Sequence, residues 1–187
     1  MKNIRMKIKF NHEVSIYSGK YPLIYLEATP ENETSQFMFE NGWVPYYDVW
    51  YQTKSARLKL KPISAKRQRQ LSKIKITTKT NNSEIKILND LEAYSSYKYF
   101  DFFMDDLFWG RVNFYDNQIL YSVSNAIKHK NSYGTLSMYY LIDSFKDKYE
   151  YLYISDYYEE FSYKSKLPGF EYWEGEKWID PTIYSHD

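Results

Sequence analysis

One stretch, from residue 131 to residue 166, constrains the fold more than any other part of the sequence. It begins with a small polar turn, Asn131 to Gly134, and continues with apolar residues between Leu136 and Phe145 that suit one side of a helix. The run from Tyr151 to Ile154 is short and apolar, which is typical of a buried strand. The expected order is therefore loop, helix, strand and loop.

The start of this expected helix is a candidate binding site. Backbone N–H groups at a helix N-terminus have no partner within the helix, so they can bind a phosphate or an oxyanion. An ordinary helix–strand unit of an α/β domain, without any such ligand, is the alternative interpretation of the same pattern. The pattern alone leaves both interpretations open.

Positive charge is concentrated in one segment of the chain. The formal net charge of the 187 residues is only +1, but the segment from Val49 to Ser83 contains no Asp or Glu. We expect this basic segment to contact phosphate or nucleic acid, and a solvated lysine-rich surface is the alternative. Its cations are Lys54, Arg57, Lys59, Lys61, Lys66, Arg67, Arg69, Lys73, Lys75 and Lys79.

Composition excludes several classes of protein and site. Aromatic residues make up 20% of the chain, against 6 glycines and 6 prolines, which excludes disordered and collagen-like chains. The lack of cysteine excludes disulfides, thiolate zinc sites, iron–sulfur clusters and thiol nucleophiles. We find no Ser/His/Asp set, no P-loop, no dinucleotide fingerprint and no metal-ligand spacing. No apolar run approaches the roughly 20 residues of a membrane span, so we expect a soluble, cytoplasmic protein that binds no membrane.

Periodicity and turn residues predict the remaining elements. Ser64 is a candidate N-cap for a short helix, and Ser83 for a longer one that runs to an aromatic patch at 94–103. A helix through 37–39 is expected to stop at Gly42, and Asp116 to Gln118 is a candidate hairpin turn. Strands are expected at 4–8, 21–26, 49–51, 56–60, 109–115 and 119–127, with a short hairpin or covering segment at 170–178.

The sum of these elements is similar to an acyltransferase of the GNAT type, the acetyltransferase superfamily. We therefore expect an α+β protein, an α/β sandwich with a mostly antiparallel central sheet flanked by helices. A small N-terminal basic subdomain is expected at 1–80 and the GNAT-like transferase domain at 81–187. Such a division fits the length of the chain.

Several blocks resemble the arginyl-tRNA–protein transferases and their bacterial leucyl-transferring relatives. In that family a Ser-x-Gly-Thr-x-Ser turn precedes a helix, a Tyr-rich strand follows, and a Met-x-Tyr-Lys element leads into a proline. The resemblance covers residues 41 to 178 in scattered blocks, and the last fifty residues are the most specific. The matching blocks are Ser132 to Ser137, Tyr151 to Tyr158, Ser162 to Lys164, Pro168 before Trp178, Asn41 to Trp43 and Ser64 to Arg69.

The chain also departs from the family. Its members usually carry paired cysteines near the N-terminus, and this chain has none. Ser155 or Asp156 stands where a glycine is usual, and Lys128 to Lys130 replace an acidic, proline-containing loop. These differences leave open an acceptor other than the N-terminal Asp or Glu that the protein-degradation enzymes select, for instance a peptide in a biosynthetic pathway.

The resemblance implies transfer of an amino acid, most simply arginine, from a charged tRNA to an amine of a peptide or protein. This reaction is aminolysis of an activated ester, so it needs no covalent enzyme intermediate and no cofactor besides the aminoacyl-tRNA. The protein has to hold both substrates, accept a proton from an amine whose pKa is near 8, and stabilise the tetrahedral oxyanion.

The residues of such a site can be named by role. Asp156 takes the proton or pairs with an arginyl guanidinium, while Tyr121, Tyr153 and Tyr157 orient the substrates or merely pack. His129 has a pKa suited to a general base, but its two lysine neighbours favour a phosphate-facing loop. Substrate-binding residues are expected at Ser132, Tyr133, Gly134, Thr135, Ser137, Tyr163 and Lys164. Contacts to tRNA are expected from Lys54, Arg57, Lys59, Lys66, Arg67, Arg69 and Lys73.

Two other functions fit the sequence. A CoA-dependent N-acetyltransferase would need a Gln/Arg-x-x-Gly-x-Gly/Ala loop at the helix start, where residues Lys130 to Thr135 offer only Gly134. A non-enzymatic RNA-binding protein would keep the basic segment without the chemistry. The amino acid transferred, the acceptor and the oligomeric state do not follow from the sequence.

Overall fold

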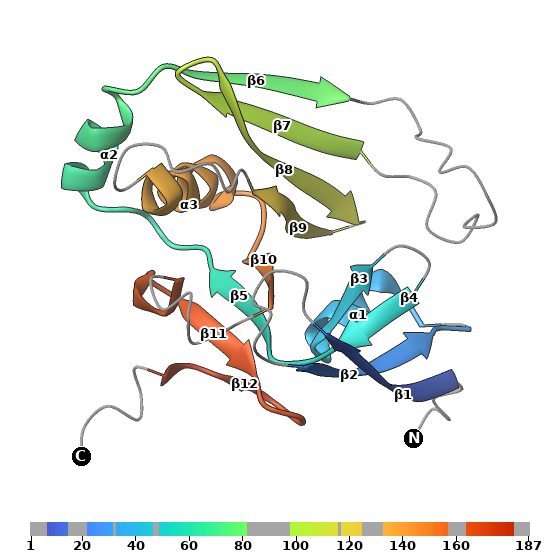
Figure 1. Cartoon of the computed structure of the whole chain (residues 1–187). Coiled ribbons are helices and arrows are strands. Elements are labelled where there is room, and N and C mark those ends of the chain that lie inside the picture. The colour runs from blue at the N-terminus through green and yellow to red at the C-terminus, as the bar shows by residue number, and fades with distance from the viewer. Residues whose placement is uncertain are drawn as a thin grey trace.

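The protein is an α+β molecule built on two β-sheets (Figure 1). The computed structural model describes residues 7–14, 22–31, 33–46, 49–81, 98–115, 117–124, 133–156 and 164–181. Within these ranges a four-stranded sheet is followed by an eight-stranded mixed sheet. No described helix is long and apolar enough to cross a membrane.

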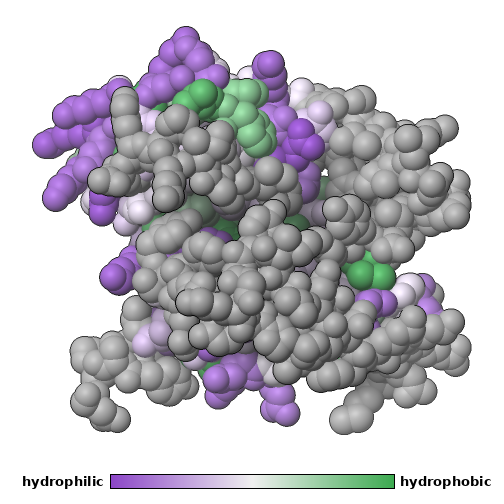
Figure 2. Space-filling view, in the orientation of Figure 1, coloured by the Kyte–Doolittle hydropathy of each residue, from purple (hydrophilic) through white to green (hydrophobic). Residues whose placement is uncertain are grey.

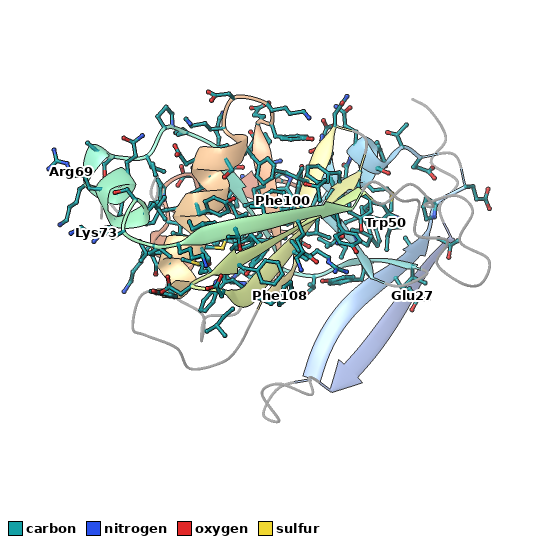
Figure 3. The ribbon with its side chains drawn as sticks, turned by 90° about the horizontal axis from the view of Figure 1, so that it is seen from above. Glu27, Trp50, Arg69, Lys73, Phe100 and Phe108 are labelled. Carbon is teal, nitrogen blue, oxygen red and sulfur yellow. The ribbon has the colours of Figure 1, made fainter. Side chains whose placement is uncertain are left out.

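The four-stranded sheet is formed by the N-terminal strands in the order β1-β2-β4-β3. The β1–β2 hairpin projects from the body of the molecule (Figure 3). Helix α1 is capped by Thr34, whose Oγ1 accepts a hydrogen bond from the Phe37 N–H at 3.1 Å. The elements are β1 (Lys7–Val14), β2 (Pro22–Thr29), α1 (Ser35–Glu40), β3 (Trp43–Tyr46) and β4 (Val49–Gln52).

The eight-stranded sheet has the order β12-β11-β5-β10-β9-β8-β7-β6. All neighbours are antiparallel except β9 and β10, which are parallel and joined by helix α3. The strands are β5 (Ser55–Lys59), β6 (Ile76–Asn81), β7 (Lys98–Met104), β8 (Leu107–Tyr115), β9 (Gln118–Ser124), β10 (Tyr151–Asp156), β11 (Phe170–Trp173) and β12 (Trp178–Ile179).

Two helices cover one face of this sheet. Helix α2 (Ala65–Leu71) is capped by Ser64, and α3 (Tyr133–Phe145) lies beside it. Leu71 of α2 and Leu141 and Ile142 of α3 belong to one apolar core with the inward residues of the strands. The apolar periodicity of α3 therefore places its buried stripe against the sheet, as the sequence predicts.

The N-terminal layer covers the opposite face of β9 and β10. Along β10, Leu152 and Ile154 enter the α3 core, whereas Tyr153 enters a second core with Met38, Phe39 and Trp50. This alternation follows from the two-residue period of a strand. Strand β10 is thus buried on both faces.

The C-terminus of α1 is tied to the rest of the molecule by three side chains. The carbonyl oxygen of Glu40 accepts from Trp178 Nε1 at 2.9 Å. The next two carbonyls accept from Gln52 Nε2 at 2.6 Å and from Ser55 Oγ at 2.7 Å. A helix of six residues has little stability of its own, so these hydrogen bonds hold it in place.

Most predicted elements are confirmed, and the differences are informative. The helices at α1, α2 and α3, the β8–β9 hairpin and the β11–β12 hairpin occur where expected. The helix expected after Ser83 falls on residues 82–97, outside the described ranges. From Lys98 onward its aromatic patch is strand β7, because Phe100, Phe102 and Met104 alternate inward. Strand β6 was not expected at all.

The expected division at residue 80 does not follow the sheets. Strand β5 pairs with β10 and β11, and β6 pairs with β7. The basic segment from Ser55 onward is therefore hydrogen-bonded into the same sheet as the C-terminal half of the chain.

Gly42 provides a test of the contact between the two layers. Its φ is +77°, and a Cβ there would stand 2.3 to 2.7 Å from the Trp173 ring. We expect Gly42→Ala to lower the free energy of unfolding by about 3 kcal/mol, through about 1–2 kcal/mol of backbone strain plus overpacking. Gly175→Ala is the matched control, since φ is +76° and no atom lies within 4 Å, and it should cost only about 1 kcal/mol. Equal losses in urea titrations of the two variants would contradict the contact.

Candidate functional site

The carboxyl ends of β9 and β10 form the candidate site. Two residue pairs join these parallel strands, Ile119 with Leu152 and Leu120 with Tyr153. Both strands continue beyond the pairs, to Ser124 and to Asp156, without further pairing to each other. The first turn of α3 lies at the same end, because α3 connects the end of β9 to the start of β10. Ligands of α/β units bind at this edge.

Tyr133 fixes the first turn of α3 to the β7–β8 turn. Its hydroxyl donates a hydrogen bond to Asp105 Oδ2, and its ring packs edge-on against Trp109 with centroids 5.7 Å apart. This hydrogen bond raises the pKa of Tyr133. Asp105 and Asp106 form the turn with φ of 50° and 65°, as a type I′ hairpin turn requires.

The same turn binds the start of β6. The Lys75 N–H donates to Asp105 Oδ1 at 3.3 Å, and the Asp105 N–H donates to the Lys75 carbonyl at 2.8 Å. The Lys75 ammonium lies 2.8 Å from the Asp106 carboxylate. The segment that follows α2 is therefore held directly beside the start of α3.

Helix α2 and the residues just after it present several exposed cations of the basic segment. Arg67 lies over the Tyr139 ring of α3, 4.7 Å from its centroid, and donates to Gln70 Oε1 at 2.8 Å. Lys66, Arg69 and Lys73 are exposed. Figure 3 shows Arg69 and Lys73 at the end of the molecule farthest from the β1–β2 hairpin, pointing outward.

The cations of β5 do not lie on this surface, which corrects the expectation that the whole basic segment contacts phosphate or nucleic acid. Arg57 is only 8% exposed. Its Nη2 lies 2.7 Å from Glu171 Oε2, and its guanidinium lies between the Tyr151 and Trp178 rings, 3.7 and 4.1 Å from their centroids. The reason is that β5 is buried on both faces, so the side opposite its leucines is also interior.

Lys54 and Lys59 lie at opposite ends of β5. Lys59 is next to the start of β10 and 3.6 Å from Glu150, at the end of the sheet remote from the start of α3. Lys54 lies at the other end, directly before Ser55, which pairs with Asp156. The Lys54 ammonium lies 4.6 Å from the Tyr172 ring centroid. Lys54 and Lys59 therefore do not lie side by side.

The two described tyrosines of the expected catalytic set face different cores. Tyr121 is buried with α3, whereas Tyr153 is buried with the N-terminal layer. Burial raises the pKa of Tyr153 to about 12. This hydroxyl keeps its proton near neutral pH, so it is poorly suited to act as a base. Both side chains are packing residues, and the structure does not bring them together.

Of the other expected site residues, some are half-buried, one is buried, and some lie outside the described residues. Gly134 and Thr135 are half-buried in the first turn of α3, beside Tyr133. Ser137 is 1% exposed and donates its hydroxyl to the Gly134 carbonyl at 2.7 Å, which leaves it no contact with a substrate. Lys164 opens the short helix Lys164–Lys166 next to β11. Ser132, Tyr157, Tyr163 and the side chain of Asp156 lie outside the described residues.

The link through Asp105 and Asp106 is the feature that sequence reasoning missed. Two acidic residues between aromatic, alternating segments are the signal of a two-residue hairpin turn. Among the described residues, no group of three or more His, Cys, Asp or Glu is arranged to hold a metal ion.

No protein-family model and no curated protein matches this chain. The geometry of the candidate site is therefore the basis for the functional proposal.

Arg57 separates a structural role from an RNA contact. We expect Arg57→Met to lower the free energy of unfolding by about 3 kcal/mol, because it leaves the partly buried Glu171 carboxylate without its partner. The double variant Arg57→Met with Glu171→Leu should recover part of this loss. Lys54→Met, at an exposed position, should change stability by less than about 0.5 kcal/mol. A stable Arg57→Met variant with weakened, less salt-dependent RNA binding would show that Arg57 is a phosphate contact instead.

Proposed function

We propose that this protein transfers an amino acid, most simply arginine, from a charged tRNA to an amine of a peptide or protein. One observation carries the proposal: the segment that follows the basic helix α2 meets the first turn of α3 at the β7–β8 turn. Lys75 binds Asp106, and the neighbouring Asp105 binds Tyr133. A tRNA acceptor arm held by the exposed cations of α2 would have its 3′ ester beside the carboxyl ends of β9 and β10.

The arrangement of strands supports a GNAT-like fold as part of this proposal. Strands β6 to β9 form an antiparallel meander, and α3 then leads to the parallel strand β10. This is the order of elements that the family resemblance implies. Because a fold does not determine its donor, the choice of an RNA ester over a CoA thioester depends on the cations of α2.

The proposed reaction assigns roles at this edge. The acceptor amine attacks the ester carbonyl, the bond to the ribose oxygen breaks, and one proton moves from the amine to that oxygen. Asp156, at the end of β10, relays this proton, and N–H groups of the first turn of α3 stabilise the oxyanion. Tyr121 and Tyr153 have no part in the proposed reaction, since both are buried.

The proposal is tested with a pool of charged tRNAs and candidate acceptor peptides, analysed by mass spectrometry for an added residue. We expect Asp156→Asn to slow transfer by about 10²- to 10⁴-fold, the usual contribution of a general base. Asp147→Asn is the control, because that exposed carboxylate lies beyond the far end of α3. Acetylation from acetyl-CoA would favour the acetyltransferase instead. RNA binding without transfer of any residue would favour a binding protein.

The role of α2 is tested through the salt dependence of tRNA binding. We expect Arg69→Ala with Lys73→Ala to weaken binding and to reduce the slope of log K against log salt by about 1.4–1.8, since each phosphate contact contributes about 0.7–0.9. Lys59→Ala with Lys148→Ala removes the same charge at the opposite end of the sheet and should leave the slope unchanged. Equal effects of the two double variants would show that binding is not directed to α2.

A further inference from the structure

Strand β6 forms an open edge of the eight-stranded sheet. It pairs with β7 along its whole length, from Ile76 to Asn81, and within the described ranges no strand lies on its other side. Figure 1 shows β6 at the upper border of the molecule. The four residues from Thr77 to Thr80 are exposed. An edge strand of this kind presents a row of backbone N–H and C=O groups that a further strand can bind.

The other described edge strands carry features that hinder pairing with a further strand. Strand β12 has only two residues, β3 contains Pro45, and β1 contains lysine and glutamate. Strand β6 contains no proline and no acid, and its register with β7 shows no bulge. Isoleucine and threonine, which favour strand pairing, supply most of its residues. Among the described edges, β6 is therefore the best suited to accept a partner strand.

The one charged side chain of β6 does not protect this edge. The Lys79 ammonium lies 5.2 Å from the Phe103 ring centroid, so the side chain lies back over its own sheet. Figure 2 shows hydrophilic and hydrophobic surface side by side at the top of the molecule, where β6 lies. The formal net charge of the whole chain is only +1. Two copies of the protein therefore repel each other weakly as they approach.

The sequence of β6 is complementary to itself in one register. A two-fold axis has to bring residues of the same face opposite each other, so it passes through a residue of the strand. An axis through Lys79 would put this lysine opposite its own copy, and an axis through Thr77 would put Lys75 opposite Lys79. An axis through Thr78 puts Lys79 opposite Thr77 instead. Of these three central registers, the one through Thr78 keeps like charges apart.

The register through Thr78 also matches the two faces of the sheet. Ile76, Thr78 and Thr80 lie on the face of α3, because their partners on β7 belong to that core or pack against it. On this face Ile76 would meet Thr80 of the second copy, and Thr78 would meet its own copy. Direct cross-strand pairs of β-branched residues stabilise a sheet. This match favours a second copy of the strand over an unrelated peptide.

We propose that the protein forms a two-fold dimer in which β6 pairs antiparallel with β6 of a second copy, with Thr78 on the axis. The helices of both copies then lie on the same side of one continuous sheet. A strand pair of this length buries less surface than a standard interface, so the dimer is reversible, with a dissociation constant in the micromolar range. The inference goes beyond the transfer reaction, because it requires neither tRNA nor an acceptor.

Disulfide formation in single-cysteine variants tests the register. The chain contains no cysteine, so each variant has only the introduced one. We expect Thr78→Cys to give a disulfide-linked dimer on a non-reducing gel after mild oxidation, because opposite residues of an antiparallel pair have Cα atoms about 4.5–5.5 Å apart. Thr80→Cys is the matched control on the same face. Its two copies would lie four residues apart, about 13 Å along the strands, which is too far for a disulfide.

Sedimentation equilibrium of the full chain measures the dimer without a covalent bond. We expect Thr78→Lys and Thr78→Glu each to weaken association by about fivefold, since like charges then lie directly opposite each other. An equimolar mixture of the two variants should associate at least as tightly as the unmodified protein, because opposite charges then meet. Thr78 is exposed, so both variants should fold, and thermal unfolding shows whether they do.

Several results would overturn the inference. These are a monomer at all concentrations through the micromolar range, and equal cross-linking of the two cysteine variants. A dimer whose dissociation constant is the same in folded Thr78→Lys, in folded Thr78→Glu and in their mixture would use another surface, and would also contradict it. Failure of amino acid transfer by a protein that dimerises as described would remove the proposed enzymatic function and leave this inference standing.

Discussion

Burial of β5 and β10 on both faces is the constraint from which much of this structure follows. Helices α2 and α3 cover one side of these strands, and the N-terminal layer covers the other. Arg57, in the middle of β5, is shielded from water, and it is compensated by Glu171 and two flanking rings. Buried charge of this kind is tolerated only with full compensation. The high content of tyrosine and tryptophan suits this demand, because their rings fill a core and also receive cations.

The same constraint separates the positive charges into those that hold the molecule together and those that face solvent. Helix α2 lies at the margin of the sheet, where Arg67 packs on α3 and its neighbours stay exposed. The β7–β8 turn then joins the segment after this helix to the start of α3 through two adjacent aspartates. The candidate site at the start of α3 and the segment after α2 are thus connected by hydrogen bonds and an ion pair.

Local signals in the sequence are enough to predict the helix α1, the N-cap of α2, the amphipathic helix α3 and the two hairpins. They do not reveal the position of β5 between β10 and β11, because those partners lie about a hundred residues away in the chain. Alternation of leucine with lysine or arginine in β5 therefore resembles a half-exposed strand. The same limit affects the candidate site: the first turn of α3 is foreseen, whereas the burial of Tyr121 and Tyr153 on opposite faces depends on which layers cover the sheet.

The hydrogen bond from Trp178 to Glu40 spans 138 positions of the chain, and the one from Arg57 to Glu171 spans 114. On a ribosome, β5 must therefore wait for nearly the whole polypeptide before its neighbours arrive. Folds with many such distant contacts form slowly. The hydrogen bonds from Arg57 to Glu171 and from Trp178 to Glu40 can therefore form only after β11 and β12 have been synthesised.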